Sequence, residues 1–152
     1  MTEDGMCKSC KNEYKIKNIE SRYHATYECR MVKYIYNQIL AEFELENDNI
    51  PLYAGSGVLI TVLDSTPGSQ QMSELINVIW SMAMNCILTA RNAKLTPRAD
   101  IIINYIKTSL IHVVKVKPTS TVTECLKSRN LIKVLNSGFA PHFLLLLLLL
   151  PF

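Results

Sequence analysis

The chain has 152 residues and a formal net charge of +3, and 49% of its residues are hydrophobic. This length fits one domain, or one small domain with a helical extension, and the apolar content excludes a chain too polar to form a core. The sequence pI of about 8.6 is only mildly basic, so the charge permits nucleic-acid binding without requiring it.

The N-terminus and the cysteines indicate the compartment. The first five residues are acidic in character and no apolar run follows them, so no secretory signal peptide is visible. The cysteines number five, and clustered cysteines in a reducing compartment favour a metal site over disulfides. We therefore expect an intracellular protein of the cytoplasm or nucleus.

The first part of the chain combines a polar segment with one amphipathic helix. Residues 1–19 are polar and contain several lysines, and they are predicted to form a loop or knuckle. A helix is predicted from Glu20 to about Glu46, because apolar side chains recur every three or four residues, at Tyr23, Tyr27, Met31, Ile35 and Ile39.

A linker is predicted for residues 47–68, where Asn, Asp, Gly and Pro are frequent. The short apolar run from Val58 to Leu63 lies inside this linker, and it could be one strand or a buried turn of helix. Because an isolated strand would have no partner, we favour a loop or helix for this run.

Three further amphipathic helices are predicted after the linker. The first follows Ser69, a suitable N-cap, and ends near Lys94. The second opens at Thr96-Pro97, because Thr caps helices and Pro fits the first helical position, and it stops at Pro118. The last helix runs from about Val122 to Asn136.

The C-terminal tail is almost pure leucine between Phe143 and Phe152. A helix of that length, at about 1.5 Å per residue, spans roughly half of the hydrocarbon core of a bilayer. We interpret the segment as a low-complexity tail and expect no membrane partner.

Four residues near the N-terminus have the spacing of metal ligands. Cys7 and Cys10 are two residues apart, and His24 and Cys29 follow after a spacer of thirteen residues. A CxxC in a tight turn can direct both sulfurs at one metal, and a second pair from another element completes a tetrahedron. Three thiolates and one imidazole close the site to water, which argues against metal-based catalysis. We therefore predict a structural Zn²⁺ as the cofactor of these residues.

The spacing of His24 and Cys29 also predicts a local irregularity. Five residues of an ideal helix turn by about 500°, which places the two side chains roughly 140° apart around the helix axis. One metal ion does not easily bridge that separation, so we predict an irregular first turn around Ala25 to Glu28.

Other interpretations of these residues stay open. The four could be unrelated, with small buried cysteines acting as hydrophobic side chains. A redox CxxC usually follows a strand and opens a helix, which the two residues between these cysteines do not indicate. Thiol catalysis by Cys10 or Cys29 with His24 would need an exposed thiolate and an oxyanion-stabilising group, and the sequence identifies neither. Cys86 and Cys125 lie on apolar helical faces and are interpreted as core residues.

The segments Cys7 to Cys10 and Glu20 to Cys29 resemble the zinc-binding region at the C-terminal end of reverse transcriptases from non-LTR (LINE-like) retrotransposons. The family pattern is a CxxC, a spacer, an acidic residue a few places before a His, and a Cys shortly after it. Trp80 and the Arg91-Asn92 pair are similar to features downstream of that pattern. The resemblance covers most of the chain.

The resemblance implies a module that helps to hold template RNA or target DNA, with the parent polymerase domain as a partner if that domain is intact. In the family, a polymerase with paired catalytic aspartates precedes this region, and no Tyr-x-Asp-Asp motif occurs in this sequence. We therefore expect a severed C-terminal fragment with no enzymatic activity of its own. Ser21 stands where the family usually carries Thr.

The cations around the CxxC are the candidate nucleic-acid-binding residues: Lys8, Lys11, Lys15, Lys17, Arg22, Arg30 and Lys33. Phosphates neutralised by such residues release counterions, so binding would depend steeply on salt. Interleaved tyrosines could stack on unpaired bases. Nearby acidic residues offset most of this charge, and a mixed-charge face is usually just soluble surface.

The sequence thus predicts a mainly α fold, with a small zinc knuckle at the N-terminus followed by about four amphipathic helices. We assign residues 1–46 to the zinc knuckle and first helix, 47–68 to a linker, 69–138 to a helical region and 139–152 to the apolar tail. The leading functional hypothesis is a zinc-binding, nucleic-acid-contacting module. The alternative is a zinc-clamped helical protein-interaction domain without a nucleic-acid role.

Overall fold

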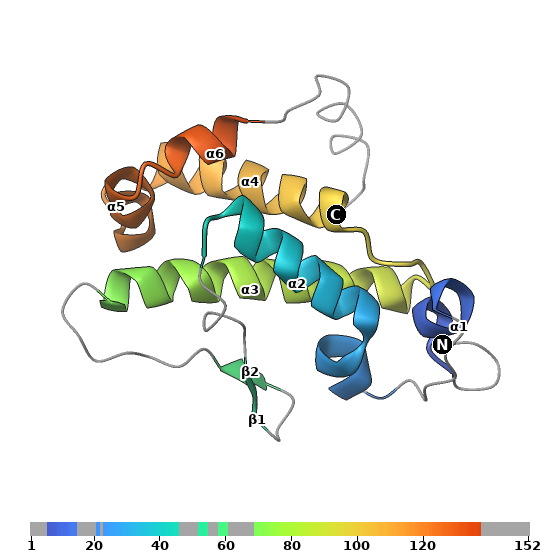
Figure 1. Cartoon of the computed structure of the whole chain (residues 1–152). Coiled ribbons are helices and arrows are strands. Elements are labelled where there is room, and N and C mark those ends of the chain that lie inside the picture. Colours follow the sequence, from blue (N-terminus) through green and yellow to red (C-terminus); the bar gives the residue numbers. More distant parts are fainter. Residues whose placement is uncertain are drawn as a thin grey trace.

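Helices dominate the structure (Figure 1), a computed structural model that describes residues 6–14, 21, 23–45, 52–54, 58–60 and 69–137. The predicted mainly α fold is confirmed. In chain order the helices are α1 (Lys8–Glu13), a π-helical turn η1 (His24–Glu28), α2 (Arg30–Glu42), α3 (Ser69–Asn92), α4 (Ala99–Val116), α5 (Thr121–Ser128) and α6 (Ile132–Asn136). The predicted tail, residues 139–152, lies outside the described residues.

The core lies where α2, α3 and α4 pack against one another. Each helix contributes apolar side chains spaced three or four residues apart, which form one buried face. Burying one such side chain is worth about 1.5–3 kcal/mol. The buried residues of these faces include Val32, Ile35 and Ile39 from α2, Leu75, Ile79 and Ile87 from α3, and Ile102, Ile106 and Leu110 from α4.

The helix α3 extends from α1 to α5. The short helix α1 lies at the C-terminal end of α3, and α5 packs near its N-terminal end (Figure 1). By length and composition alone the segment Gln71–Asn92 would also fit a membrane span. Its most apolar face packs inside the protein, however, where Trp80 meets Tyr36 of α2 edge to face with ring centroids 5.1 Å apart.

The helix α4 begins later than the sequence predicted. We expected Thr96-Pro97 to open it, but its first residue is Ala99 and its N-cap residue is Arg98, whose backbone is extended. The Arg98 guanidinium binds the Asp100 carboxylate with contacts of 2.6 and 3.1 Å. The Asp100 carboxylate also lies in the first turn of α4, where the helix dipole favours a negative charge.

The last predicted helix is two helices, because the chain turns between α5 and α6. Asn130 has a φ of 59°, a left-handed conformation that Asn tolerates better than most residues. The Leu131 N–H donates to the Leu126 carbonyl at 2.9 Å, so the turn closes the end of α5 in the manner of a Schellman motif.

A short β-hairpin precedes α3. The strands β1 (Leu52–Ala54) and β2 (Val58–Ile60) are antiparallel, and Tyr53 pairs with Leu59. The preference for a loop or helix at Val58 to Leu63 was therefore wrong for its first three residues. The partner strand was missed, although a Gly-containing connection of three residues between two apolar runs is a hairpin signal.

Candidate metal centre

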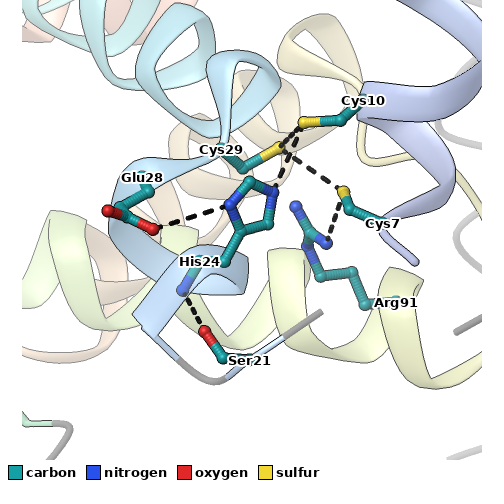
Figure 2. A network of polar contacts seen from close by, with 7 residues as sticks. All are labelled: Cys7, Cys10, Ser21, His24, Glu28, Cys29 and Arg91. Atoms are coloured by element: carbon teal, nitrogen blue, oxygen red, sulfur yellow. Dashed lines mark hydrogen bonds and ion pairs between the residues drawn. The ribbon is translucent and has the colours of Figure 1, made fainter. Parts of the chain in front are cut away.

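The side chains of Cys7, Cys10, His24 and Cys29 converge on one point (Figure 2). Their ligand atoms all lie within 4.8 Å of one another, and all four residues are buried. The Cys29 sulfur is 3.9 Å from that of Cys7 and 3.7 Å from that of Cys10. The His24 Nε2 atom is 3.3 Å from the Cys10 sulfur. The predicted convergence of these residues is confirmed.

These separations fit the edges of a coordination tetrahedron. Zinc–sulfur bonds of about 2.3 Å at tetrahedral angles place two sulfurs about 3.8 Å apart, and a zinc–nitrogen bond of about 2.0 Å places nitrogen about 3.5 Å from sulfur. A disulfide would need about 2.05 Å between sulfurs, and no disulfide joins any of these described cysteines. The cluster can therefore hold one metal ion, and its donor set is one that zinc prefers.

The helix α1 presents the first two cysteines. Cys7 is its N-cap residue, with φ −67° and ψ 116°, and the Lys11 N–H donates to the Cys7 carbonyl at 2.9 Å. Residues three apart at such a helix start share one face, so Cys10 points to the same side as Cys7. The sequence predicted a loop or knuckle here, whereas the CxxC opens a short helix.

The π-helical turn η1 brings the second pair of ligands together. The Cys29 N–H donates to the His24 carbonyl at 2.9 Å, a link across five residues that makes the turn wider than an α-helical one. The regular helix α2 begins only after Cys29. The irregular first turn predicted around Ala25 to Glu28 is confirmed, and it removes the angular separation that an ideal helix would impose.

Polar contacts hold the His24 ring and backbone in place. The Ser21 hydroxyl accepts a hydrogen bond from the His24 N–H at 2.9 Å, which any hydroxyl residue at this position could do. On the ring, Nδ1 lies 3.8 Å from a carboxylate oxygen of Glu28. A carboxylate on this side of an imidazole favours metal binding through the opposite nitrogen, Nε2, which is the atom that faces Cys10.

A buried hydrogen bond from the core supports η1. The Tyr36 hydroxyl donates to the Thr26 carbonyl at 2.7 Å, and its ring packs against Trp80 of α3. Burial raises the pKa of Tyr36 above its ordinary value, while the nearby Arg91 charge lowers it in part. The hydroxyl therefore stays protonated at physiological pH and remains a donor to η1.

A cation from α3 reaches the cluster. Arg91 Nη1 donates to the Cys7 sulfur at 3.6 Å, although 84 residues separate the two in sequence. The sequence alone does not place Arg91 at the site. Its only signal was the Arg-Asn pair of the family resemblance. Tyr36 and Glu28 were missed as well, since neither carries a motif that marks a supporting role.

Four of the predicted nucleic-acid-binding residues lie on two elements that contact each other, α1 and the first turn of α2. All four are exposed: Lys8, Lys11, Arg30 and Lys33. The Arg30 guanidinium carbon lies 5.7 Å from the centre of the Tyr14 ring, a cation–π contact. The other three predicted cations, Lys15, Lys17 and Arg22, lie outside the described residues.

The two remaining cysteines were both predicted as core residues. Cys125 is 3% exposed and lies in the core, whereas Cys86 on α3 is only partly buried and packs against it. Burial raises the pKa of both thiols, with a smaller opposing effect of Arg129 on Cys125. Raised pKa values keep these thiols protonated and poorly reactive.

Comparison of the chain with protein-family models, with curated proteins and with solved structures finds no match. The resemblance to the retrotransposon region therefore rests on the motif residues themselves. The molecule is a small helical protein with a buried Cys₃His cluster near its N-terminus that can bind a metal ion.

Proposed function

We propose that this protein is a zinc-binding module that contacts RNA or DNA. One Zn²⁺, held by Cys7, Cys10, His24 and Cys29, would join α1 and η1 to the helical body. The buried Cys₃His cluster is the observation that carries the proposal. We propose a structural role for the metal, because four protein ligands leave no position at which water or substrate could bind.

The donor set favours zinc over other divalent ions. Thiolates are soft ligands that select zinc, copper(I) or iron–sulfur clusters, whereas carboxylates and carbonyls suit magnesium and calcium. Metal binding would also offset the conformational entropy lost by a polar segment that buries little apolar surface of its own. Zinc is expected to stabilise the native arrangement of α1 and η1 most strongly.

The exposed cations support nucleic-acid contact. Lys8, Lys11, Arg30 and Lys33 come from two adjacent elements that the metal would hold in a fixed relation. A surface of this kind can neutralise several phosphates at once, and each one neutralised releases counterions. Glu28, also exposed, lies near the same elements and reduces the local charge. We therefore expect moderate affinity rather than tight binding.

The retroelement origin belongs to the same proposal. Its support is that the motif residues behind the resemblance meet at one place: the CxxC and the His-x₄-Cys pair form the cluster, and Arg91 contacts Cys7. On this proposal the chain is a C-terminal fragment of a non-LTR reverse transcriptase. It would have no polymerase activity, and its partners would be nucleic acid and the parent polymerase domain.

A salt titration tests the nucleic-acid role. Binding of the zinc-loaded full chain to a fluorescent single-stranded RNA or DNA is measured by anisotropy at several salt concentrations. A plot of log K against log salt should fall by about 0.7 for each phosphate contact. Changing Lys11 and Lys33 together to Gln should weaken binding and flatten that slope.

The matched control removes two exposed lysines from the far end of α4, Lys115 and Lys117. Changing both to Gln alters the net charge equally and should leave the slope close to that of the unchanged chain. An equal effect of the two double variants would mean that the protein has no localised binding face. Absence of binding by the zinc-loaded chain would refute the nucleic-acid role.

One observation favours the alternative of a protein-interaction domain. An open groove of about 600 Å³ lies between α2, the α3–α4 connection and α4. Met31, Tyr34 and Ile103 are among its lining residues, and Tyr34 is 50% exposed. Under this alternative, zinc clamps the N-terminus and single-stranded nucleic acid does not bind.

A further inference from the structure

The metal cluster has a cation beside it that comes from α3, the longest helix of the core. Figure 2 shows the Arg91 guanidinium directed at Cys7, with Nη1 donating to the sulfur at 3.6 Å. We propose that Arg91 is a positioning residue of the metal centre, which orients the Cys7 thiolate and balances the charge of the metal–thiolate group. This inference rests on the metal site proposed above.

The charge of the centre explains why a cation belongs there. A divalent ion with three thiolates and one neutral imidazole carries a net charge of about −1. A buried charge without a partner is costly, and a nearby opposite charge offsets that cost. Cys7, Cys10 and Cys29 are all 0% exposed, so water cannot supply the compensation. The guanidinium stays charged in proteins and also donates a hydrogen bond to sulfur.

The position of Arg91 is fixed by the fold. It lies in the last turn of α3, one turn after Ile87, which is fully buried. The same end of α3 receives a second contact from α1, because the Lys8 ammonium donates to the Lys94 carbonyl at 2.9 Å. These two bonds join α1 to this end of α3, and the Arg91–Cys7 bond acts on a candidate metal ligand.

Arg91 also lies close to the support of η1. Its charge acts on Tyr36, whose hydroxyl donates to the Thr26 carbonyl within η1. One guanidinium therefore contacts Cys7 directly and lies near the residue that supports the turn of the second ligand pair. The metal centre and the end of α3 are expected to form one coupled unit.

Cobalt titration tests this role, because Co²⁺ occupies tetrahedral thiolate sites and reports on them by absorption. The full chain, Arg91→Gln and Arg91→Met are titrated with Co²⁺, and Zn²⁺ affinity is then measured by competition. Loss of a supporting residue should weaken metal affinity by about 10–100-fold. The sulfur-to-cobalt charge-transfer band should move to lower energy, because the thiolate loses a donor that stabilises its lone pairs.

Two further variants separate charge from packing. Arg91→Lys keeps the positive charge and should recover most of the affinity. Arg129→Gln removes an exposed arginine that lies just after α5, and it should match the unchanged chain in both readouts. Circular dichroism of each loaded variant reports its helix content, so that loss of fold is recognised directly.

The outcomes distinguish this inference from the proposed function. If the unchanged chain binds neither Co²⁺ nor Zn²⁺, the metal site itself is refuted. If it binds both tightly, and Arg91→Gln or Arg91→Met folds with the same affinity and the same band, the role of Arg91 is overturned while the metal site stands. If both neutral variants lose their fold, rescue by Arg91→Lys supports the charge requirement, and failure of that rescue overturns it.

Discussion

The backbone N–H of Cys29 donates to the carbonyl of His24 at 2.9 Å, closing a turn that is one residue wider than an α-helical turn. An ideal helix would point these two side chains in different directions. The wider turn accommodates the extra residue, so that both side chains meet the CxxC of α1. A single local irregularity thus converts a sequence spacing unsuited to a helix into a cluster with tetrahedral dimensions.

Removing the hydroxyl of Tyr36 by substitution tests how much this side chain stabilises that turn. Tyr36→Phe removes the hydroxyl and leaves the Thr26 carbonyl buried without this donor. The free energy of unfolding of the metal-loaded protein should fall by about 1–3 kcal/mol, measured by urea denaturation. Tyr34→Phe is the control, because Tyr34 is 50% exposed and its change should stay within about 0.5 kcal/mol. Equal small effects of both variants would show that the hydrogen bond contributes little.

Metal removal should loosen the N-terminal elements more than the rest of the helical body. A zinc chelator, or Cys7→Ser, should expose α1 and η1 to protease. The helices α3, α4 and α5 should keep most of their protection, because α4 and α5 both pack against α3 and none of the three helices contains a candidate ligand. Limited proteolysis with mass spectrometry locates the cuts, and circular dichroism measures the helix that remains. Cys86→Ser serves as the control. A protease pattern insensitive to chelator would argue against a structural metal.

The start of α4 should make stability depend weakly on pH. The hydrogen bond from Arg98 holds the pKa of Asp100 below its usual value. A carboxyl group whose pKa is lowered by folding stabilises the native state above its unfolded pKa, and that contribution is lost as the pH falls through the folded value. Asp100→Asn should therefore be less stable than the unchanged chain at neutral pH.

The expected difference is well under about 1 kcal/mol, because both side chains are largely exposed and solvent screens the pair. Urea denaturation of the two proteins across a pH series measures it. The two curves should converge at strongly acidic pH. A difference that persists there would assign the effect to something other than the ionised carboxylate.

The candidate metal cluster could be predicted from the sequence because the two ligands of each pair lie close together in the chain. The two ligand pairs each lie within a few residues, and the spacing of His24 and Cys29 pointed directly to an irregular turn. The contact between Arg91 and Cys7 joins residues 84 positions apart, and no periodicity within either segment predicts it. The tertiary contact between α1 and the end of α3 decides it.

The differences in secondary structure have equally local causes. The last helix was predicted as continuous because its apolar spacing continues across Asn130, and spacing does not reveal a left-handed residue. The helix α4 begins later than predicted because the backbone of Arg98 is extended, with φ −121° and ψ 129°, so that Ala99 is the first helical residue. The hairpin was missed because each strand has only three residues, too few to show an alternating pattern.

Elemental analysis of the purified full chain shows directly whether the four candidate ligands hold zinc. We expect one zinc per chain, lost in His24→Ala and in Cys29→Ser but retained in Cys86→Ser, whose thiol lies outside the cluster. A chain purified under reducing conditions that neither contains zinc nor takes it up, or one that keeps its zinc after His24→Ala, would refute the Cys₃His zinc site.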